Sequence, residues 1–277
     1  MLENRKLYIL VTCVFWATAV AFQSANAQIG IEAITVPSAD VTLSFVQPGR
    51  IMEIIPKEGG VVAADEALVR LDDAVDQVRL EIMKAQSESS SQLEASKATL
   101  DQKKIDFEKL EWASERGAST PQEVAHAALD VRIAELGLEI AEFDHRQTLR
   151  QYHAEKARVD DMTLNSPITG SVEKISVEVG ESVGSAAPVI RVVQIDPLWI
   201  DVHVALGQAM TLKSGQLAQV VFPDDPENPV SAKIIFIAAV ADAGSSTLRT
   251  RLEVSNKSDR PAGQHVTILF QDTTQDN

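Results

Sequence analysis

The residues that could carry out chemistry are few in this sequence. Its five histidines are His126, His145, His153, His203 and His265, and no two of them stand four residues apart, the spacing at which one helix face offers two imidazoles to a metal ion. His145 and His153 lie two helical turns apart on an acidic stretch, a pattern typical of a solvated helix face. There is no G-x-S-x-G nucleophile motif and no glycine-rich phosphate loop. We therefore expect no catalytic site, no metal site and no enzyme.

One lysine has the surroundings of a cofactor attachment site. Glu81-Ile82-Met83-Lys84-Ala85 imitates the sequence around a biotinylated lysine, which would make the chain a biotinyl or lipoyl carrier. A carrier lysine needs a tight β-turn, whereas Lys84 falls inside a segment that predicts a helix. The carrier is kept as the alternative of a different class, and we predict no cofactor.

The N-terminal residues predict export. Residues 1–27 have the pattern of a secretory signal peptide, with Arg5 and Lys6 before an apolar run and Ala25-Asn26-Ala27 as a cleavage site. The one cysteine, Cys13, lies in that run without the preceding residues of a lipid-attachment box, so we predict no lipid anchor. The formal net charge of −15 disfavours nucleic acid and favours protein partners.

Two long segments predict helices, because they lack internal proline and strand-like alternation: Asp73 to about Arg116 and Pro121 to about Val159. Apolar residues in the second segment recur at 4-3-4-3 spacing, which predicts a seam against a partner helix. The first segment has a weaker seam, preceded by the serine-rich Ser87 to Ser91, where we expect flexing. The seam residues are Leu129, Ile133, Leu136, Ile140 and Phe143 in the second segment, and Leu93, Ser96, Leu100, Lys103, Phe107 and Leu110 in the first.

The residues between these helices predict a sharp reversal. Gly117 can take the left-handed conformation that ends a helix. Thr120, Pro121 and Glu123 then supply an N-cap, a first-position proline and a capping-box carboxylate. At about 1.5 Å per residue each arm is about 60 Å long. We expect an antiparallel hairpin that leaves a globular body and returns to it.

The sequence flanking the helices is repeated. Gly49 to Leu71 and Gly170 to Val192 share their pattern at an offset of 121 residues, with short apolar runs broken by glycines. Each copy predicts about four short β-strands, too few to bury a core alone. We expect the two copies to form one domain, which the helical hairpin interrupts.

These features resemble the periplasmic adaptor subunits, or membrane fusion proteins, of the HlyD-like and RND efflux systems. Pro48-Gly49-Arg50-Ile51 and residues 163–172 are similar to the stretches that lead into the first and second halves of that family's split lipoyl domain. Pro197-Leu198-Trp199-Ile200, residues 212–216 and Pro261-Ala262-Gly263-Gln264 are similar to landmarks of its β-barrel. The resemblance implies a mixed, elongated, multi-domain fold: a split lipoyl (barrel-sandwich hybrid) β domain, interrupted by an antiparallel α-helical coiled-coil hairpin and followed by a small antiparallel β-barrel.

The domain boundaries that we expect are a signal peptide at 1–27, N-terminal strands with the first lipoyl half at 28–72, the helical hairpin at 73–160, the second lipoyl half at 161–195, the β-barrel at 196–272 and a tail at 273–277.

The sequence departs from the family at two places. Few residues precede Val41 or follow Phe270, so we expect no membrane-proximal domain, or a vestigial one. Many efflux adaptors carry an Arg, a Leu and a Ser at fixed spacing near the tip. Aligning Thr120 with that serine places Lys109 and Ala113 at the other two positions, and aligning Ser119 places Glu108 and Trp112 there.

The resemblance implies a non-enzymatic periplasmic adaptor that links an inner-membrane transporter, of RND or ABC type, to a TolC-like outer-membrane channel. An RND pump is favoured, and an ABC exporter or type I secretion system is the alternative. Self-association as a hexamer is implied as well. The residues expected to contact the channel are those of the tip: Arg116, Gly117, Ala118, Ser119 and Thr120.

Overall fold

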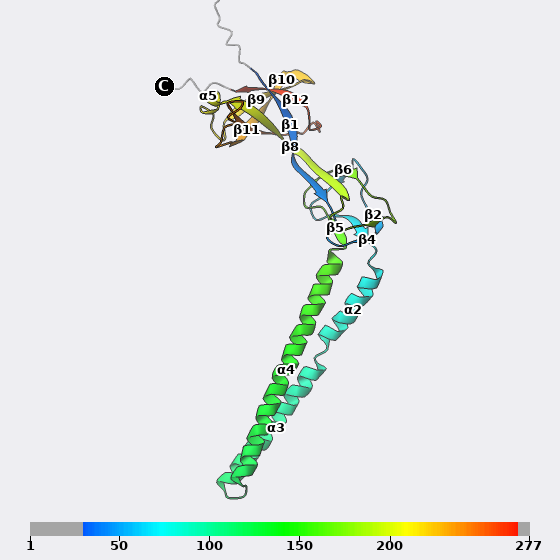
Figure 1. The fold of residues 1–277 in the computed structure, drawn as a ribbon, viewed down its shortest axis with the longest axis vertical. Coiled ribbons are helices and arrows are strands. Elements are labelled where there is room, and N and C mark those ends of the chain that lie inside the picture. Colours follow the sequence, from blue (N-terminus) through cyan, green and yellow to red (C-terminus); the bar gives the residue numbers. More distant parts are fainter. Residues whose placement is uncertain (1–29, 271–277) are drawn as a thin grey trace, which may run out of the picture. The chain divides into compact units, whose positions relative to one another are not determined.

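The computed structural model describes residues 30–270 of the chain, so the predicted signal peptide and tail lie outside the described residues. The described chain forms two compact units, one made of residues 39–194 and the other of residues 30–38 with 195–270. Figure 1 shows their elements. Within residues 30–270, no helix is both long and apolar enough to cross a bilayer.

The first unit contains the two copies of the repeat, and strands of one copy pair with strands of the other. Gly49 pairs with Val183, Val61 with Ser171 and Ala67 with Asn165, all in antiparallel ladders. The strands of the first copy are β2 (Gly49–Ile54), β3 (Val61–Val62) and β4 (Ala67–Leu71), and those of the second copy are β5 (Thr163–Asn165), β6 (Gly170–Ile175) and β7 (Ser182–Val183).

One hydrophobic core lies between the two copies, as the sequence predicts. Ile51 and Leu68 from the first copy and Val172 and Ile190 from the second are at most 1% exposed and belong to the same cluster. Gly170 must stay without a side chain, because a Cβ there would lie 2.4 Å from the carbonyl oxygen of Val193. The copies therefore fold as one domain despite the helices inserted between them.

The inserted helices are α2 (Ala74–Glu88), α3 (Ser91–Glu115) and α4 (Pro121–Asp160). The prediction of one continuous first helix is wrong, since it ends at Ser89, which has an extended ψ of 114°. The next helix restarts after Ser90, whose hydroxyl donates to the Glu94 carboxylate at 2.6 Å. Serine side chains compete for backbone hydrogen bonds, and three in a row favour this break over a continued helix.

The face by which α3 packs on α4 agrees with the seam expected for the first helix. Leu100 is buried, and the other five positions of that seam are half-buried. α3 and α4 contact each other and run in opposite directions (Figure 1).

The seam expected for the second helix is wrong. Its five large apolar residues are 43–62% exposed. The face of α4 that is buried or half-buried consists of smaller residues at the same 3-4 spacing, which let the two helix axes approach closely. Its members are Val124, Ala127, Val131, Ala134, Leu138 and Ala141.

The second unit is a closed barrel of six antiparallel strands in the order β1-β12-β9-β10-β11-β8, with a β1–β8 pairing that completes the ring. Alternate residues of β8, from Leu198 to Val204, point into its core and are at most 1% exposed. Its elements are β1 (Ile31–Leu43), β8 (Ile190–Ala205), the short helix α5 (Leu206–Ala209), β9 (Leu217–Phe222), β10 (Asp225–Ile237), β11 (Thr247–Val254) and β12 (His265–Phe270).

The small antiparallel barrel expected near the C-terminus is therefore present. Within the barrel, residues 223–229 contain three prolines and yet form largely the first part of β10. Its pairing with β9 is irregular between Asp225 and Val230, and residues 226–229 are exposed.

Candidate functional site

The end of α3 is fixed by its own backbone. Arg116 is the C-cap, and Gly117 follows in the left-handed region with φ +68°. The N–H of Gly117 donates to the carbonyl of Ser114 at 3.0 Å, and that of Ala118 donates to the carbonyl of Ala113 at 2.9 Å. These two bonds form a Schellman motif, which satisfies the last carbonyls of the helix.

The start of α4 is closed by a capping box. The N–H of Glu123 donates to Oγ1 of Thr120 at 3.3 Å, and the N–H of Thr120 donates to a carboxylate oxygen of Glu123 at 2.7 Å. The Thr120 hydroxyl also donates to that oxygen, at 2.9 Å. The bonds from the Thr120 backbone and hydroxyl hold the pKa of the Glu123 carboxyl below its usual value. The hydroxyl of Thr120 is thus used within the chain.

The tip carries an aromatic residue that sequence reasoning did not select as a site. Trp112 is 60% exposed. The guanidinium carbon of Arg116 lies 3.8 Å from the centroid of its ring, and Nη1 of Arg116 donates to the Trp112 carbonyl at 3.0 Å. The signal in the sequence was a tryptophan outside the seam expected for that helix. Because Arg116 is held over this ring, the two side chains present one flat surface that is apolar and cationic.

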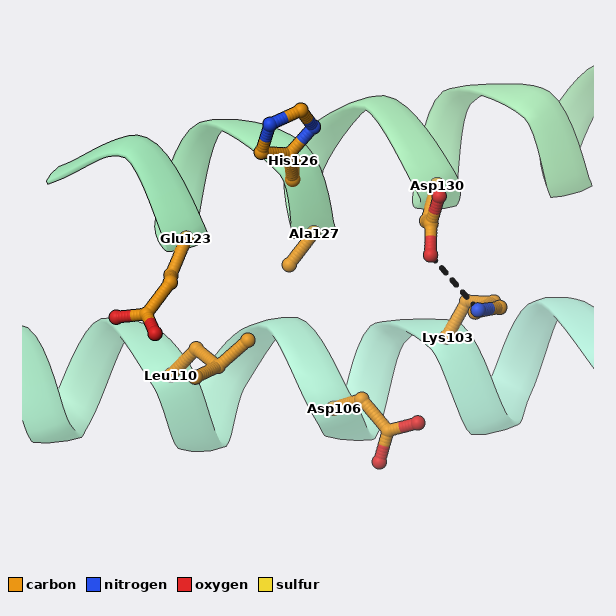
Figure 2. A pocket seen from close by; sticks show the side chains of 7 residues that line it. All are labelled: Lys103, Asp106, Leu110, Glu123, His126, Ala127 and Asp130. Carbon is orange, nitrogen blue, oxygen red and sulfur yellow. Dashed lines mark hydrogen bonds and ion pairs between the residues drawn. The ribbon is translucent and has the colours of Figure 1, made fainter. Parts of the chain in front are cut away.

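A groove of about 390 Å³ lies between α3 and α4 beside the tip (Figure 2). Lys103 of α3 crosses it to Asp130 of α4, with 2.8 Å between Nζ and Oδ2, and this bond raises the pKa of Lys103. His126 points away from α3 in Figure 2, whereas Glu123 points toward it. The residues that line the groove are Lys103, Asp106, Leu110, Glu123, His126, Ala127 and Asp130.

The other candidates from the sequence are scattered. Lys84 lies inside α2 with its ammonium 4.0 Å from the Glu88 carboxylate, and so it does not occupy a β-turn. His145 is half-buried and His153 is exposed on α4. Among residues 30–270, no group of three or more His, Cys, Asp or Glu side chains is placed to hold a metal ion.

The opposite ends of the helices are anchored to the β domain. Arg158 of α4 forms ion pairs with Asp76 of α2 and, at 2.7 Å, with Glu155. The hydrogen bond from Arg158 lowers the pKa of Glu155. The side-chain amide of Gln47 donates to the Arg158 carbonyl at 2.9 Å. Arg158 of α4 therefore contacts both α2 and the loop that leads into β2.

The barrel has an ordered outer face on β8 and β11. Arg251 binds the Asp201 carboxylate with two hydrogen bonds of 2.7 and 2.8 Å, and these bonds lower the pKa of Asp201. The same guanidinium lies 4.4 Å from the ring centroid of Trp199, the tryptophan of the predicted barrel landmark. Trp199 is thus on the outside of the barrel, stacked under Arg251.

The barrel matches a known family of domains. Residues 197–272 fit the family model described as the CusB-like β-barrel domain. Among curated proteins, the fatty acid resistance protein FarA of Neisseria gonorrhoeae is 29% identical over 195 residues, which are 64% of this chain and 49% of FarA. The aligned part thus spans about half the length of that relative.

Solved structures show the same fold. MacA from Actinobacillus actinomycetemcomitans superposes with a TM-score of 0.74 at 18% identity, over 88% of this chain and 78% of MacA. The membrane fusion protein Spr0693 from Streptococcus pneumoniae R6 superposes with a TM-score of 0.59 at 16% identity, over 89% of this chain and all of that one (100%).

The chain therefore has the fold of MacA and of the membrane fusion protein Spr0693, and the resemblance to membrane fusion proteins deduced from the sequence is confirmed. Its C-terminal barrel matches the family of CusB-like β-barrel domains.

Proposed function

We propose that this chain is a periplasmic adaptor that links an inner-membrane transporter to an outer-membrane channel in a tripartite efflux system. The observation that carries this proposal is the way in which the β domain holds the helices. The N–H of Leu71, at the end of β4, donates to the carbonyl of Met162 at 2.9 Å, and Arg70 pairs with Thr163. The arms leave and re-enter the domain at adjacent strands, so two paired strands support a coiled-coil hairpin.

The working end of this hairpin is the tip from Arg116 to Thr120. Its backbone is fixed by the Schellman motif and by the capping box, and a pre-organised loop loses little conformational entropy on binding. The surface that it offers the channel is the Arg116 guanidinium over Trp112, beside the exposed Ala118.

An RND transporter is the favoured inner-membrane partner. The family of the barrel carries RND in its name, and the relative FarA is named for resistance to fatty acids, which fits an efflux role. An ABC exporter or a type I secretion system is the alternative. The transporter supplies the energy, and the adaptor needs no cofactor.

The same proposal places the mature chain in the periplasm, exported by the signal peptide of residues 1–27 without a lipid anchor. Copies of the chain then stand side by side, six in a ring, with their barrels toward the transporter.

Site-specific photo-crosslinking in cells tests the proposal. A benzophenone amino acid at the exposed Ala118 is expected to capture an outer-membrane channel, and one at the exposed Glu227 of β10 an inner-membrane transporter. Gln151, exposed in the C-terminal quarter of α4, is the control and should capture neither. If neither experimental position captures a membrane protein, the chain is not an adaptor.

A further inference from the structure

The stripe of large apolar residues on α4 has no cover within residues 30–270. Its residues are between 43% and 62% exposed, and their 4-3-4-3 spacing keeps them on one edge of the helix. A contiguous apolar surface of this kind marks an interaction site, and a period of 3.5 residues suits a second helix. The outer stripe comprises Leu129, Ile133, Leu136, Ile140 and Phe143.

The other arm also has an apolar outer edge. Ile105 and Trp112 stand seven residues apart on α3 and are 46% and 60% exposed. On α2, Val75, Val78 and Ile82 are 55–74% exposed. Each chain therefore carries two different uncovered edges, one on each side of the helical pair. Two different edges that meet in neighbouring copies make a head-to-tail contact, which can close into a ring.

The ion pairs between the two helical arms show which residues of α4 lie at the same level along the hairpin as which residues of α2 and α3. Lys103 meets Asp130, and Asp76 meets Arg158. Because the arms run in opposite directions, Ile105 lies level with Leu129 to within one residue. By the same count, Ala98 lies level with Leu136, and Ser91 with Phe143.

Side-chain sizes on the two outer edges are complementary at two levels, whereas Leu129 and Ile105, which share a third level, are both large. Where α4 carries Leu136 and Phe143, the opposite edge of α3 carries the small Ala98 and Ser91. Nearer the β domain, the stripe positions of α4 after Phe143 are Gln147, Arg150, Ala154 and Ala157. The last two are small and lie within two residues of the level of Ile82 and Val78, which α2 exposes.

Charges beside these edges are complementary as well. Arg132 flanks the outer stripe and lies level, to within one residue, with the exposed Asp101 of the opposite edge, and Arg146 lies level with Glu88. In the described part of the chain, Arg132 forms an ion pair with Glu135 of its own helix, with 3.1 Å between Nη1 and Oε2. The Arg132 side chain is 65% exposed. An exposed pair of this kind is weak, so Arg132 can turn to another carboxylate.

We propose that the outer stripe of α4 docks on the outer edge of α2 and α3 of a second copy of this chain, at the same height along the arms. The inference rests on the proposed function for the side-by-side arrangement of the copies. It adds which faces meet and in what register: Leu129 against Ile105 and Leu136 against Ala98 of the neighbouring copy.

Disulfide crosslinking of the full-length chain in cells tests this register, in a Cys13→Ser background so that the introduced thiols are the only ones. Leu129→Cys with Ile105→Cys, and Leu136→Cys with Ala98→Cys, are expected to give a ladder of covalent oligomers on mild oxidation. Within one chain these positions lie on opposite outer edges, roughly 13 Å apart, too far for an internal bond. Every disulfide formed therefore joins two copies.

The swapped pairs are the matched control. Leu129→Cys with Ala98→Cys, and Leu136→Cys with Ile105→Cys, use the same four sites shifted by about 10 Å along the helices, and are expected to give little product. The proposal would be overturned by equal yields from matched and swapped pairs, by dimers from Leu129→Cys alone, or by the absence of any oligomer. A disulfide to a different protein in place of a second copy would also overturn it.

A charge exchange gives a second readout. Arg132→Asp is expected to reduce the Leu129–Ile105 crosslink several-fold, and adding Asp101→Arg to restore it; failure of the restoration counts against the register. Capture of partners from Ala118 and Glu227 is scored separately. If those captures succeed and the disulfides fail, the interface is wrong and the adaptor function stands, whereas the reverse result would remove the function alone.

Discussion

Arg158 of α4 is paired with Asp76 of α2, 82 residues earlier in the chain. The same guanidinium binds Glu155, and the carbonyl of Arg158 accepts a hydrogen bond from Gln47. This arrangement fixes the height of one arm against the other at the β domain, where both arms begin. Beyond the break at Ser89, the ion pair of Lys103 with Asp130 gives the level at which α3 and α4 meet.

Arg158→Gln should weaken the contact between α2 and α4 next to the β domain. Asp76 and Glu155 are only 18% and 11% exposed and would lose their cation. Because the Arg158 side chain is 36% exposed, solvent screening limits the expected loss in the free energy of unfolding to about 1 kcal/mol. Hydrogen exchange in α2 should accelerate. Arg132→Gln, which breaks an exposed pair within one helix, is the control and should leave α2 unchanged.

The effect of Arg158→Gln should depend on pH. The pKa of Glu155 is lowered by Arg158, so the native state binds the proton less readily than the unfolded chain does. The stabilisation is complete above the usual pKa of a glutamate and disappears as the pH falls through the lowered value. Urea unfolding should thus separate wild type from variant at pH 7, and the difference should vanish in acid. A constant difference would contradict the ion-pair explanation.

Gly117→Ala and Gly137→Ala should change stability in opposite directions. Gly117 has φ +68°, where an alanine Cβ costs about 1 kcal/mol. Gly137 lies inside α4 with open space around it, and alanine there should stabilise the helix by roughly 0.5–1 kcal/mol. Thermal unfolding compares the two variants directly. Equal effects would show that the helix end is not held by a left-handed residue.

Thr120→Ala should fray the start of α4. The substitution removes the acceptor for the Glu123 N–H and a donor to its carboxylate, at a cost of about 1 kcal/mol for an N-cap. Faster amide exchange is expected in the first turn of α4 only. Ser119→Ala is the control, because the Ser119 hydroxyl donates to the Thr120 carbonyl over a long 3.4 Å and makes the smallest of the contributions that lower the pKa of Glu123. Exchange that spread along the whole helix would indicate a wider role for Thr120.

Leu100→Ala and Leu136→Ala distinguish the two faces of the arms. Leu100 is 7% exposed and lies between α3 and α4, so truncation should destabilise the chain by roughly 2–4 kcal/mol. Leu136 is 43% exposed, and its loss should cost a dilute, unassociated chain much less. Chemical unfolding at low protein concentration measures both. Similar losses would mean that the face with larger residues packs inside the chain after all.

Much of this structure was predictable because its signals are local. Glycine at the end of α3, the Thr120–Glu123 capping box and the alternation along β8 each depend on a few neighbouring residues. The repeat was informative for another reason: neither copy has enough apolar residues for a core, so they had to combine. The Trp112–Arg116 stack was missed, since a side chain four residues away can adopt many rotamers in the absence of a structure.

The sequence by itself determined that α4 has two faces with heptad spacing, one of large and one of small residues. It could not determine which face meets α3, because both have the same period and greater bulk favoured the wrong one. The tertiary structure decided this: the short turn at Gly117 and the Arg158 anchor hold the arms close together, and Ala127, Ala134 and Ala141 fit between them. Close packing of the arms selects the small face, and the large face is left for a partner.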